Sequence, residues 1–181
     1  SSWVTDGCPR ETAIHKIEEV HKWGFNGQGL DKRQVILFEE PYLSNFISMI
    51  QVWNETNDTA KMQDTLSTCS QTPYVKIARF SKWICFINQE KFAIYDSRVS
   101  LALRQIKSAN SRVFPTLGAK SAGRPNADFI STNKMVAADK TAKIYMLYTN
   151  MLRAVLPHYN LSSVAELEMA LFMLGTDNSY W

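Results

Sequence analysis

Cysteine is scarce in this chain, and its three copies lie far apart in the sequence. The cysteines are Cys8, Cys69 and Cys85, and no two of them form a Cys-x-x-Cys motif. Their odd number and wide spacing argue against a disulfide framework and favour a reducing compartment. His15 and His21 are six residues apart, rather than the three or four that place two ligands on one helix face. The sequence therefore predicts no metal site and no cofactor.

Long apolar runs are also missing. No stretch of about 18 apolar residues is present, so we expect no membrane-spanning helix. The first ten residues lack the charged-then-apolar layout of a secretory signal. At 181 residues, with 45% hydrophobic side chains, the chain fits one domain with a buried core. We expect a single helical domain over residues 1–181 in an intracellular setting, either the cytoplasm and nucleoid or the nucleus.

Alternation of polar and apolar residues, the pattern of β-strands, hardly occurs. Two β-rich pieces, at 34–38 and 92–95, are too few to form a sheet. Apolar residues instead recur at spacings of three and four, which predicts an all-α fold. Residues 108–128 carry glycines and prolines and predict a long loop, and Pro157 is expected to end a helix. The expected helices are 11–23, 41–53, 58–66, 75–87, one after Asp96, 133–156, and a last one from the capping box Ser163–Glu166 to Gly175.

Acidic residues are rare between Ser70 and Pro125. This basic segment carries ten Lys and Arg against two acids, a net charge of +8, which leaves −5 for the rest of a chain whose total is +3. Segregated positive charge is typical of proteins that bind polyanions such as nucleic acids. Residues 70–125 are therefore the expected DNA-facing half of the domain.

Within the basic segment, residues 69–103 combine several features in one order. Lys76 stands at an expected helix start, a polar turn follows that helix, and an apolar approach ends at Asp96, where a new helix begins. The element Tyr95-Asp96-Ser97-Arg98-Val99 has the form apolar-Asp-x-x-Val and lies 20 positions after Lys76. This stretch of 35 residues resembles the core of the helix-hairpin-helix DNA glycosylase superfamily, whose members are compact helical domains.

The resemblance implies an enzyme that cleaves the N-glycosidic bond of a modified or damaged base, flipped out of double-stranded DNA. Asp96 would stabilise the positive charge that develops on the sugar, or would act as a base. Lys76 would attack the sugar C1′ and form a Schiff base, which adds lyase activity, and neighbouring cations would lower its pKa. The expected DNA contacts are Arg79, Lys82, Arg98, Arg104, Lys120 and Arg124.

The expected hairpin differs from the family pattern. There the chain reads apolar-Gly-apolar-Gly before the lysine, whereas here the matching residues are Thr72-Pro73-Tyr74-Val75. Glycines let the backbone approach a DNA phosphate closely, so their absence predicts that this hairpin binds the phosphate more weakly. A remodelled hairpin favours an unusual substrate, such as a modified base.

Plainer interpretations stand beside these. An Asp before an apolar helix is commonly an N-cap, and a lysine in a first turn is commonly solvated. Residues 83–86 are typical of a core rather than a base-stacking platform, and Cys85 among them is typical of a small buried hydrophobe. Two other functions remain open: a non-catalytic helical DNA-binding module, and a helical protein–protein interaction domain with an acidic partner.

Overall fold

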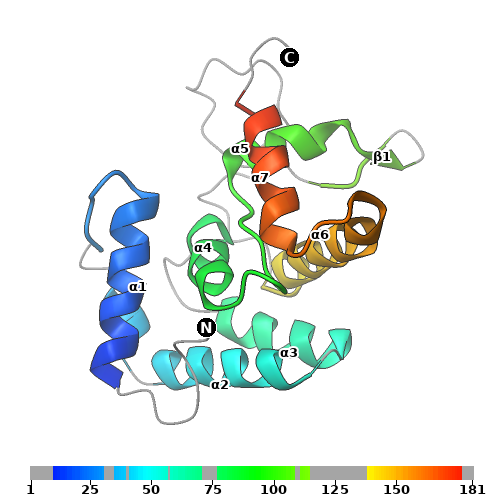
Figure 1. Cartoon of the computed structure of the whole chain (residues 1–181). Helices are drawn as coiled ribbons and strands as arrows, with labels where there is room; N and C mark the ends of the chain where they lie inside the picture. The colour runs from blue at the N-terminus through cyan, green and yellow to red at the C-terminus, as the bar shows by residue number, and fades with distance from the viewer. Residues whose placement is uncertain are drawn as a thin grey trace.

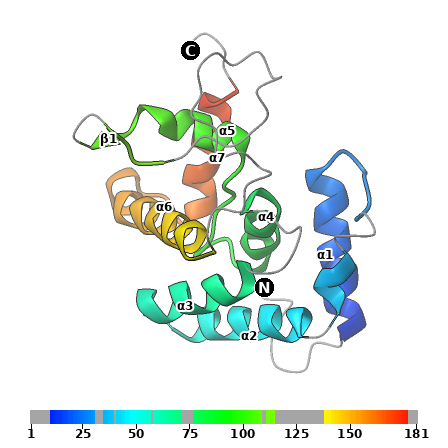
Figure 2. The ribbon, with the colours of Figure 1, turned by 180° about the vertical axis from the view of Figure 1, so that it is seen from behind.

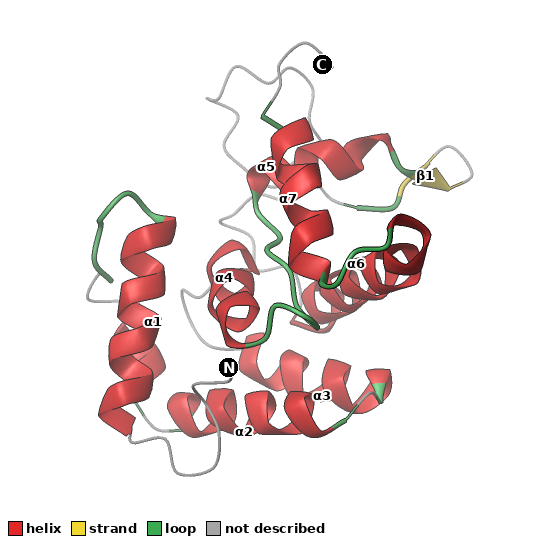
Figure 3. Cartoon of the chain, viewed as in Figure 1, coloured by secondary structure: helices red, strands yellow, loops and turns green. Residues whose placement is uncertain are grey.

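The computed structural model describes residues 10–30, 35–39, 41–56, 58–70, 77–108, 111–114 and 138–176. These residues are mostly helical, which confirms the predicted class (Figure 3). In chain order the elements are α1 (Arg10–Gly24), the 3₁₀ helix η1 (Val35–Phe38), α2 (Tyr42–Glu55), α3 (Thr59–Ser70), α4 (Ile77–Ile87), α5 (Ser97–Ala102), the 3₁₀ helix η2 (Leu103–Gln105), β1 (Lys107–Ser108), β2 (Ser111–Arg112), α6 (Ala138–Tyr159) and α7 (Val164–Leu174).

Helix α4 is the centre of the fold. It lies between α1 on one side and α6 with α7 on the other, while α2 and α3 run across one end (Figures 1 and 2). Trp83 of α4 is fully buried, and the Phe46 ring of α2 meets Trp83 and Phe80 edge to face, at 6.2 and 5.6 Å between centroids. Burial of one large apolar side chain contributes about 1.5–3 kcal/mol, so these rings are a main source of stability. The prediction that residues 83–86 belong to the core is confirmed for Trp83, Ile84 and Cys85, while Phe86 is half-buried.

Two helix starts follow the caps that the sequence predicts. The Asp58 carboxylate accepts hydrogen bonds from the amides of Ala60 and Lys61, at 2.9 and 3.2 Å, and so caps α3. Ser163 accepts from the Glu166 amide at 3.3 Å at the start of α7. The carboxylate of Glu166 reaches back to the Ser162 amide at 3.0 Å, one residue before the position of the usual capping box.

Two local expectations are wrong within the described residues. Helix α6 runs through Pro157 to Tyr159, because a proline in the last turn removes only one helical hydrogen bond and the chain turns just afterwards, at Asn160 with φ 53°. The loop expected from residue 108 begins instead with a short hairpin that pairs Lys107 with Arg112. Residues 35–38 form the 3₁₀ helix η1.

Several sequence expectations fall on residues outside the described ranges. They concern the hairpin at 72–75, the loop from 115 to 128, and the first part of the helix expected from 133. Helix α4 is described from Ile77, and α3 extends to Ser70, beyond the expected end at 66. Residues 92–95, the second β-rich piece, are extended and almost fully buried.

Gly175, directly after α7, lies against the backbone of Arg98 near the start of α5. A Cβ atom on Gly175 would overlap the Arg98 carbonyl oxygen, which is backbone and cannot move aside as a flexible side chain would. We therefore expect Gly175→Ala to lower the free energy of unfolding by at least about 1–3 kcal/mol, measured by urea denaturation. Gly29→Ala is the control, because a Cβ there meets nothing within 4 Å. Equal stability of the two variants would contradict this packing.

Candidate functional site

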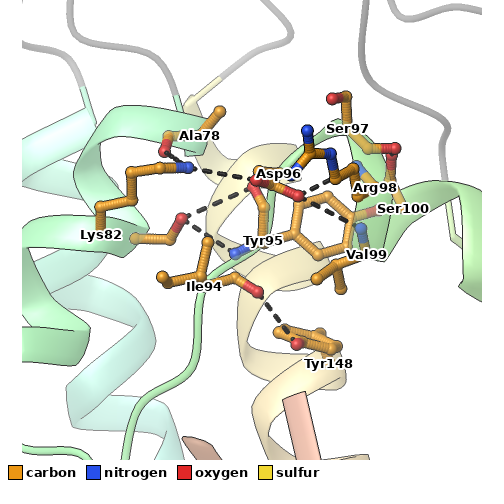
Figure 4. A network of polar contacts seen from close by, with 11 residues as sticks. Ala78, Lys82, Ile94, Tyr95, Asp96, Ser97, Arg98, Val99, Ser100 and Tyr148 are labelled. Carbon is orange, nitrogen blue, oxygen red and sulfur yellow. Dashed lines mark hydrogen bonds and ion pairs between the residues drawn. The ribbon is translucent and has the colours of Figure 1, made fainter. Parts of the chain in front are cut away.

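Asp96 caps the short helix α5, as the N-cap interpretation predicts. Its backbone is extended, and one carboxylate oxygen, Oδ1, accepts from the amides of Arg98 and Val99 at 2.9 and 3.2 Å (Figure 4). The side chain keeps 17% of its surface exposed. The backbone thus holds Oδ1, while the other oxygen is available to a second partner.

That second partner is Lys82, which comes from α4. Its Nζ lies 3.3 Å from Asp96 Oδ2 and 3.4 Å from the Ala78 carbonyl oxygen (Figure 4). The Lys82 side chain is only 9% exposed. Its stem packs so closely on Gly24 that a Cβ there would lie 2.7 Å from Lys82 Cδ. Lys82 was expected to be a DNA contact; the structure places its largely buried side chain in an ion pair with the partly exposed Asp96, where its ammonium holds the aspartate.

Three side-chain hydroxyls hold the extended segment 92–95 that leads to Asp96. An isolated extended segment needs hydrogen-bond partners for its backbone when it is buried, and here no neighbouring strand among the described residues supplies them. The Tyr95 amide donates to Ser81 Oγ of α4 at 3.0 Å. From α6, Tyr145 donates to the Ala93 carbonyl at 2.8 Å and Tyr148 to the Ile94 carbonyl at 3.0 Å.

The two tyrosines of α6 are protonated donors near neutral pH. Burial is the main cause that raises the pKa of both Tyr145 and Tyr148 far above the ordinary phenol value. Neither ring is exposed. Helix α6 therefore positions Asp96 from a distance, through the backbone of the segment before it.

Glu168 of α7 is a further titratable group at this site. It is 4% exposed, and its pKa is raised to about 7, first by burial and then by the negative charge of Asp96, against the opposing effect of Lys82. Sequence reasoning missed it. The available signal was a single charged residue in the otherwise apolar run 167–174.

Cys85 of α4 is buried, as predicted. It is 2% exposed, and burial raises the pKa of its thiol to about 12, so almost no thiolate forms near neutral pH. Cys85 is therefore unsuited to act as a nucleophile.

The expected DNA-binding cations have different surroundings. Arg98 is exposed, and its guanidinium lies over the Phe172 ring of α7, 4.7 Å from the centroid. Arg79 is half-buried with its guanidinium 5.2 Å from the centroid of the Phe25 ring, and Arg104 is partly exposed. Lys76, Lys120 and Arg124 lie outside the described residues. Arg98, two residues after Asp96, is thus the exposed cation that the structure describes beside the ion pair.

The described part of the chain shows neither a metal cluster nor a membrane span. No three His, Cys, Asp or Glu side chains gather there in a way that could hold a metal ion. None of its helices has the length and apolar character needed to cross a membrane.

Comparison with known proteins adds no relative. No protein-family model matches the chain, and neither the curated proteins nor the solved structures yield a match. The resemblance to DNA glycosylases rests on residues 69–103 alone.

The hydroxyl of Tyr148 should be worth a measurable part of the stability. In Tyr148→Phe the buried Ile94 carbonyl loses its donor, and we expect the free energy of unfolding to fall by about 1–3 kcal/mol in urea denaturation. The matched control is Tyr159→Phe, because that ring is 65% exposed and the change should stay within about 0.5 kcal/mol. Equal losses in the two variants would mean that the hydroxyl does not hold the segment.

Glu168 should make the folded protein less stable as the pH rises. The unfolded carboxyl ionises near 4.5, whereas the folded one keeps its proton to about 7, so between these values only the unfolded state has released it. The free energy of unfolding should therefore fall by about 2–3 kcal/mol between roughly pH 5 and 8 from this group.

Glu168→Gln removes that fall, because an amide does not ionise. The measurement is the free energy of unfolding at both pH values for the wild type and the variant. Glu166→Gln, at an exposed position on the same helix, is the control and should not flatten the profile. An unchanged profile in Glu168→Gln would show that this carboxyl ionises normally.

Proposed function

We propose that this chain is a DNA glycosylase of the helix-hairpin-helix kind that cleaves the N-glycosidic bond of a modified or damaged base. The observation that carries the proposal is the arrangement of Asp96. Its carboxylate is oriented by two backbone amides and the Lys82 ammonium, yet keeps 17% of its surface exposed. A carboxylate held in this way is oriented before any substrate arrives.

The chemistry of base release needs such a group. When the bond between C1′ and the base nitrogen breaks, its electron pair leaves with the base, and the sugar becomes positively charged. A fixed negative charge beside C1′ stabilises that transition state without reorganising, an effect worth about 10²–10³-fold in rate for one such group. Asp96 supplies the charge. Water then adds hydroxide to C1′ and its other proton goes to the departing base, so the products are the free base and an abasic sugar.

The basic segment supports binding of DNA. Arg98 is exposed two residues after Asp96, and the Phe172 ring beneath its guanidinium restricts its orientation. An arginine held in this way suits a backbone phosphate, which fixes the register of the duplex relative to the carboxylate.

Two lysines take different roles in the proposal. Lys82 contacts Asp96 directly and is largely buried, so it acts as a positioning residue. The resemblance gives Lys76 the role of the amine that attacks C1′, here the aldehyde carbon of the ring-opened abasic sugar left after base release, and Lys76 precedes the first described residue of α4. Lyase activity therefore belongs to Lys76 in this proposal, and base release belongs to Asp96.

The test is base release and strand nicking on duplexes that carry a panel of modified bases. Asp96→Asn should lower the rate of release by about 10²-fold or more, because the amide carries no charge. Lys76→Gln should abolish nicking and leave release in place. Lys107→Gln, which removes an exposed positive charge on β1, is the control for a general loss of DNA affinity.

The alternatives predict different results. A wild-type protein that binds DNA and releases no base from any duplex would be a non-catalytic DNA-binding module. A protein without measurable DNA affinity at physiological salt would fit a helical interaction domain with an acidic partner. Binding should weaken steeply with salt in either DNA-binding case, so product formation is the deciding measurement.

A further inference from the structure

The last turn of helix α1 ends against α4 at the position of Lys82. Gly24, the final residue of α1, leaves room for the lysine stem, since a Cβ there would lie 2.7 Å from Lys82 Cδ and 3.1 Å from its Cε. The helix stops just afterwards, because Gly27 has a φ of 78° and its amide donates back to the Lys22 carbonyl at 2.7 Å. This turn holds Phe25 beside α4.

The Phe25 ring faces two cations of α4. Its centroid lies 5.6 Å from Lys82 Nζ and 5.2 Å from the guanidinium carbon of Arg79, within the range in which an aromatic face attracts a positive charge. The buried His21 ring stacks on Phe25 with the centroids 4.6 Å apart, which restricts the orientation of the phenyl ring. Phe25 is half-buried, so water screens the attraction only in part.

These contacts leave the Lys82 ammonium little freedom. Its neighbours are Asp96 Oδ2 at 3.3 Å, the Ala78 carbonyl oxygen at 3.4 Å and the Phe25 ring. The side chain is 9% exposed. A lysine otherwise has a flexible stem and a compact charge that can turn towards another anion nearby. The end of α1 therefore confines the ammonium to the side of α4 on which Asp96 lies.

The proposed reaction brings other anions near this ammonium. Asp96 faces C1′ of one nucleotide in that reaction, and the phosphates on both sides of the nucleotide are only a few bonds from C1′. They attract the same positive charge. A Lys82 ammonium that moved to a phosphate would leave Asp96 Oδ2, and the carboxylate would lose one of the three contacts that orient it.

We propose that Phe25 is a positioning residue for Lys82: its ring keeps the ammonium on Asp96 when the phosphates of bound DNA lie nearby. The inference rests on the proposed function for the DNA and for the effect on catalysis, whereas the confinement of Lys82 requires neither. Loss of the ring should release Lys82, which slows base release and at the same time adds a phosphate contact. A slower reaction without weaker binding distinguishes this role from a general loss of structure, which would weaken both.

The first experiment needs no DNA. The folded protein is acetylated with an N-hydroxysuccinimide ester, and mass spectrometry follows the rate at Lys82 relative to the exposed Lys22 of the same chain. Phe25→Leu keeps an apolar side chain without an aromatic face, and it should raise the relative rate by about fivefold, as expected for the loss of one cation–π interaction. Phe25→Tyr keeps the face and should return the rate towards the wild-type value.

A matched control separates the ring from a general loosening of α1. Trp23→Leu removes another aromatic side chain of this helix, whose ring meets Phe86 edge to face at 4.9 Å, and it should leave the Lys82 rate unchanged. Gly24→Ala pushes on the lysine stem with the Phe25 ring in place and should raise the rate. Phe25→Met replaces Phe25→Leu if that variant does not fold.

Two results of this experiment would overturn the inference. One is a Lys82 rate that stays at the wild-type value when the Phe25 ring is removed. The other is a rate that rises equally in Trp23→Leu, because the ring would then act only through the stability of the helix.

The second experiment measures DNA binding against salt concentration. Each phosphate contact adds about 0.9 to the slope of log K against log salt, so Phe25→Leu should bind with a slope steeper by about that amount. Lys82→Met in the Phe25→Leu background should remove this increment, whereas Lys82→Met alone should leave the wild-type slope unchanged. An increment that persists without Lys82 would belong to Arg79, the other cation at the ring, and would contradict the proposed role.

Base release by the same variants is measured in single turnovers with saturating protein. Phe25→Leu should lower the rate by about tenfold or more, because the carboxylate is no longer held in its orientation. Its affinity for DNA at low salt should equal or exceed that of the wild type. Phe25→Tyr should recover most of the rate, and Trp23→Leu should match the wild type. An unchanged rate in Phe25→Leu would overturn the effect on catalysis.

The two kinds of measurement separate the inference from the proposed function. Acetylation of Lys82 that depends on Phe25, in a protein that releases no base from any duplex, would refute the enzyme and leave the confinement of Lys82 intact. Base release that depends on Asp96, with Lys82 equally reactive in all variants, would refute the inference and leave the enzyme intact.

Discussion

The extended segment 92–95 is the constraint on which the site depends. It is almost fully buried among helices, and the hydroxyls of Ser81, Tyr145 and Tyr148 supply hydrogen bonds to its backbone. A buried backbone group that lacks a partner costs free energy comparable to a lost hydrogen bond, so few conformations of this segment are allowed. These hydrogen bonds therefore fix the direction of the chain at the end of segment 92–95, and that direction determines the position of Asp96.

The ion pair adds electrostatic order to this backbone order. Asp96 Oδ1 is held by amides of its own helix, while Oδ2 is held by Lys82 from α4, so the carboxylate joins two elements that are separate in the sequence. Such a largely buried ion pair contributes little net stability, because desolvation of the two charges offsets most of their attraction. The buried carboxyl of Glu168 on α7, whose pKa is raised to about 7, is a further group whose charge changes near neutral pH.

Some features of the site could be predicted from the sequence because their causes are local. An aspartate before an apolar helical stripe predicts an N-cap, and Asp96 is one. The apolar surroundings of Cys85 predict a buried thiol. Other features were not predictable. Lys82 stands in a strongly basic segment and suggests a surface cation, yet the carboxylate that pairs with it lies 14 residues further along the chain.

The sequence alone determined the helical class, most helix positions and the local caps, because periodicity and capping act over a few residues. Only the tertiary structure decided that Lys82 pairs with Asp96, that tyrosines of α6 hold the segment before Asp96, and that Glu168 is buried. The ion pair and the two tyrosine hydrogen bonds join residues 14 to 54 positions apart in the chain. Their existence depends on how the helices pack, and no spacing rule along one chain encodes the partner of a side chain across such a distance.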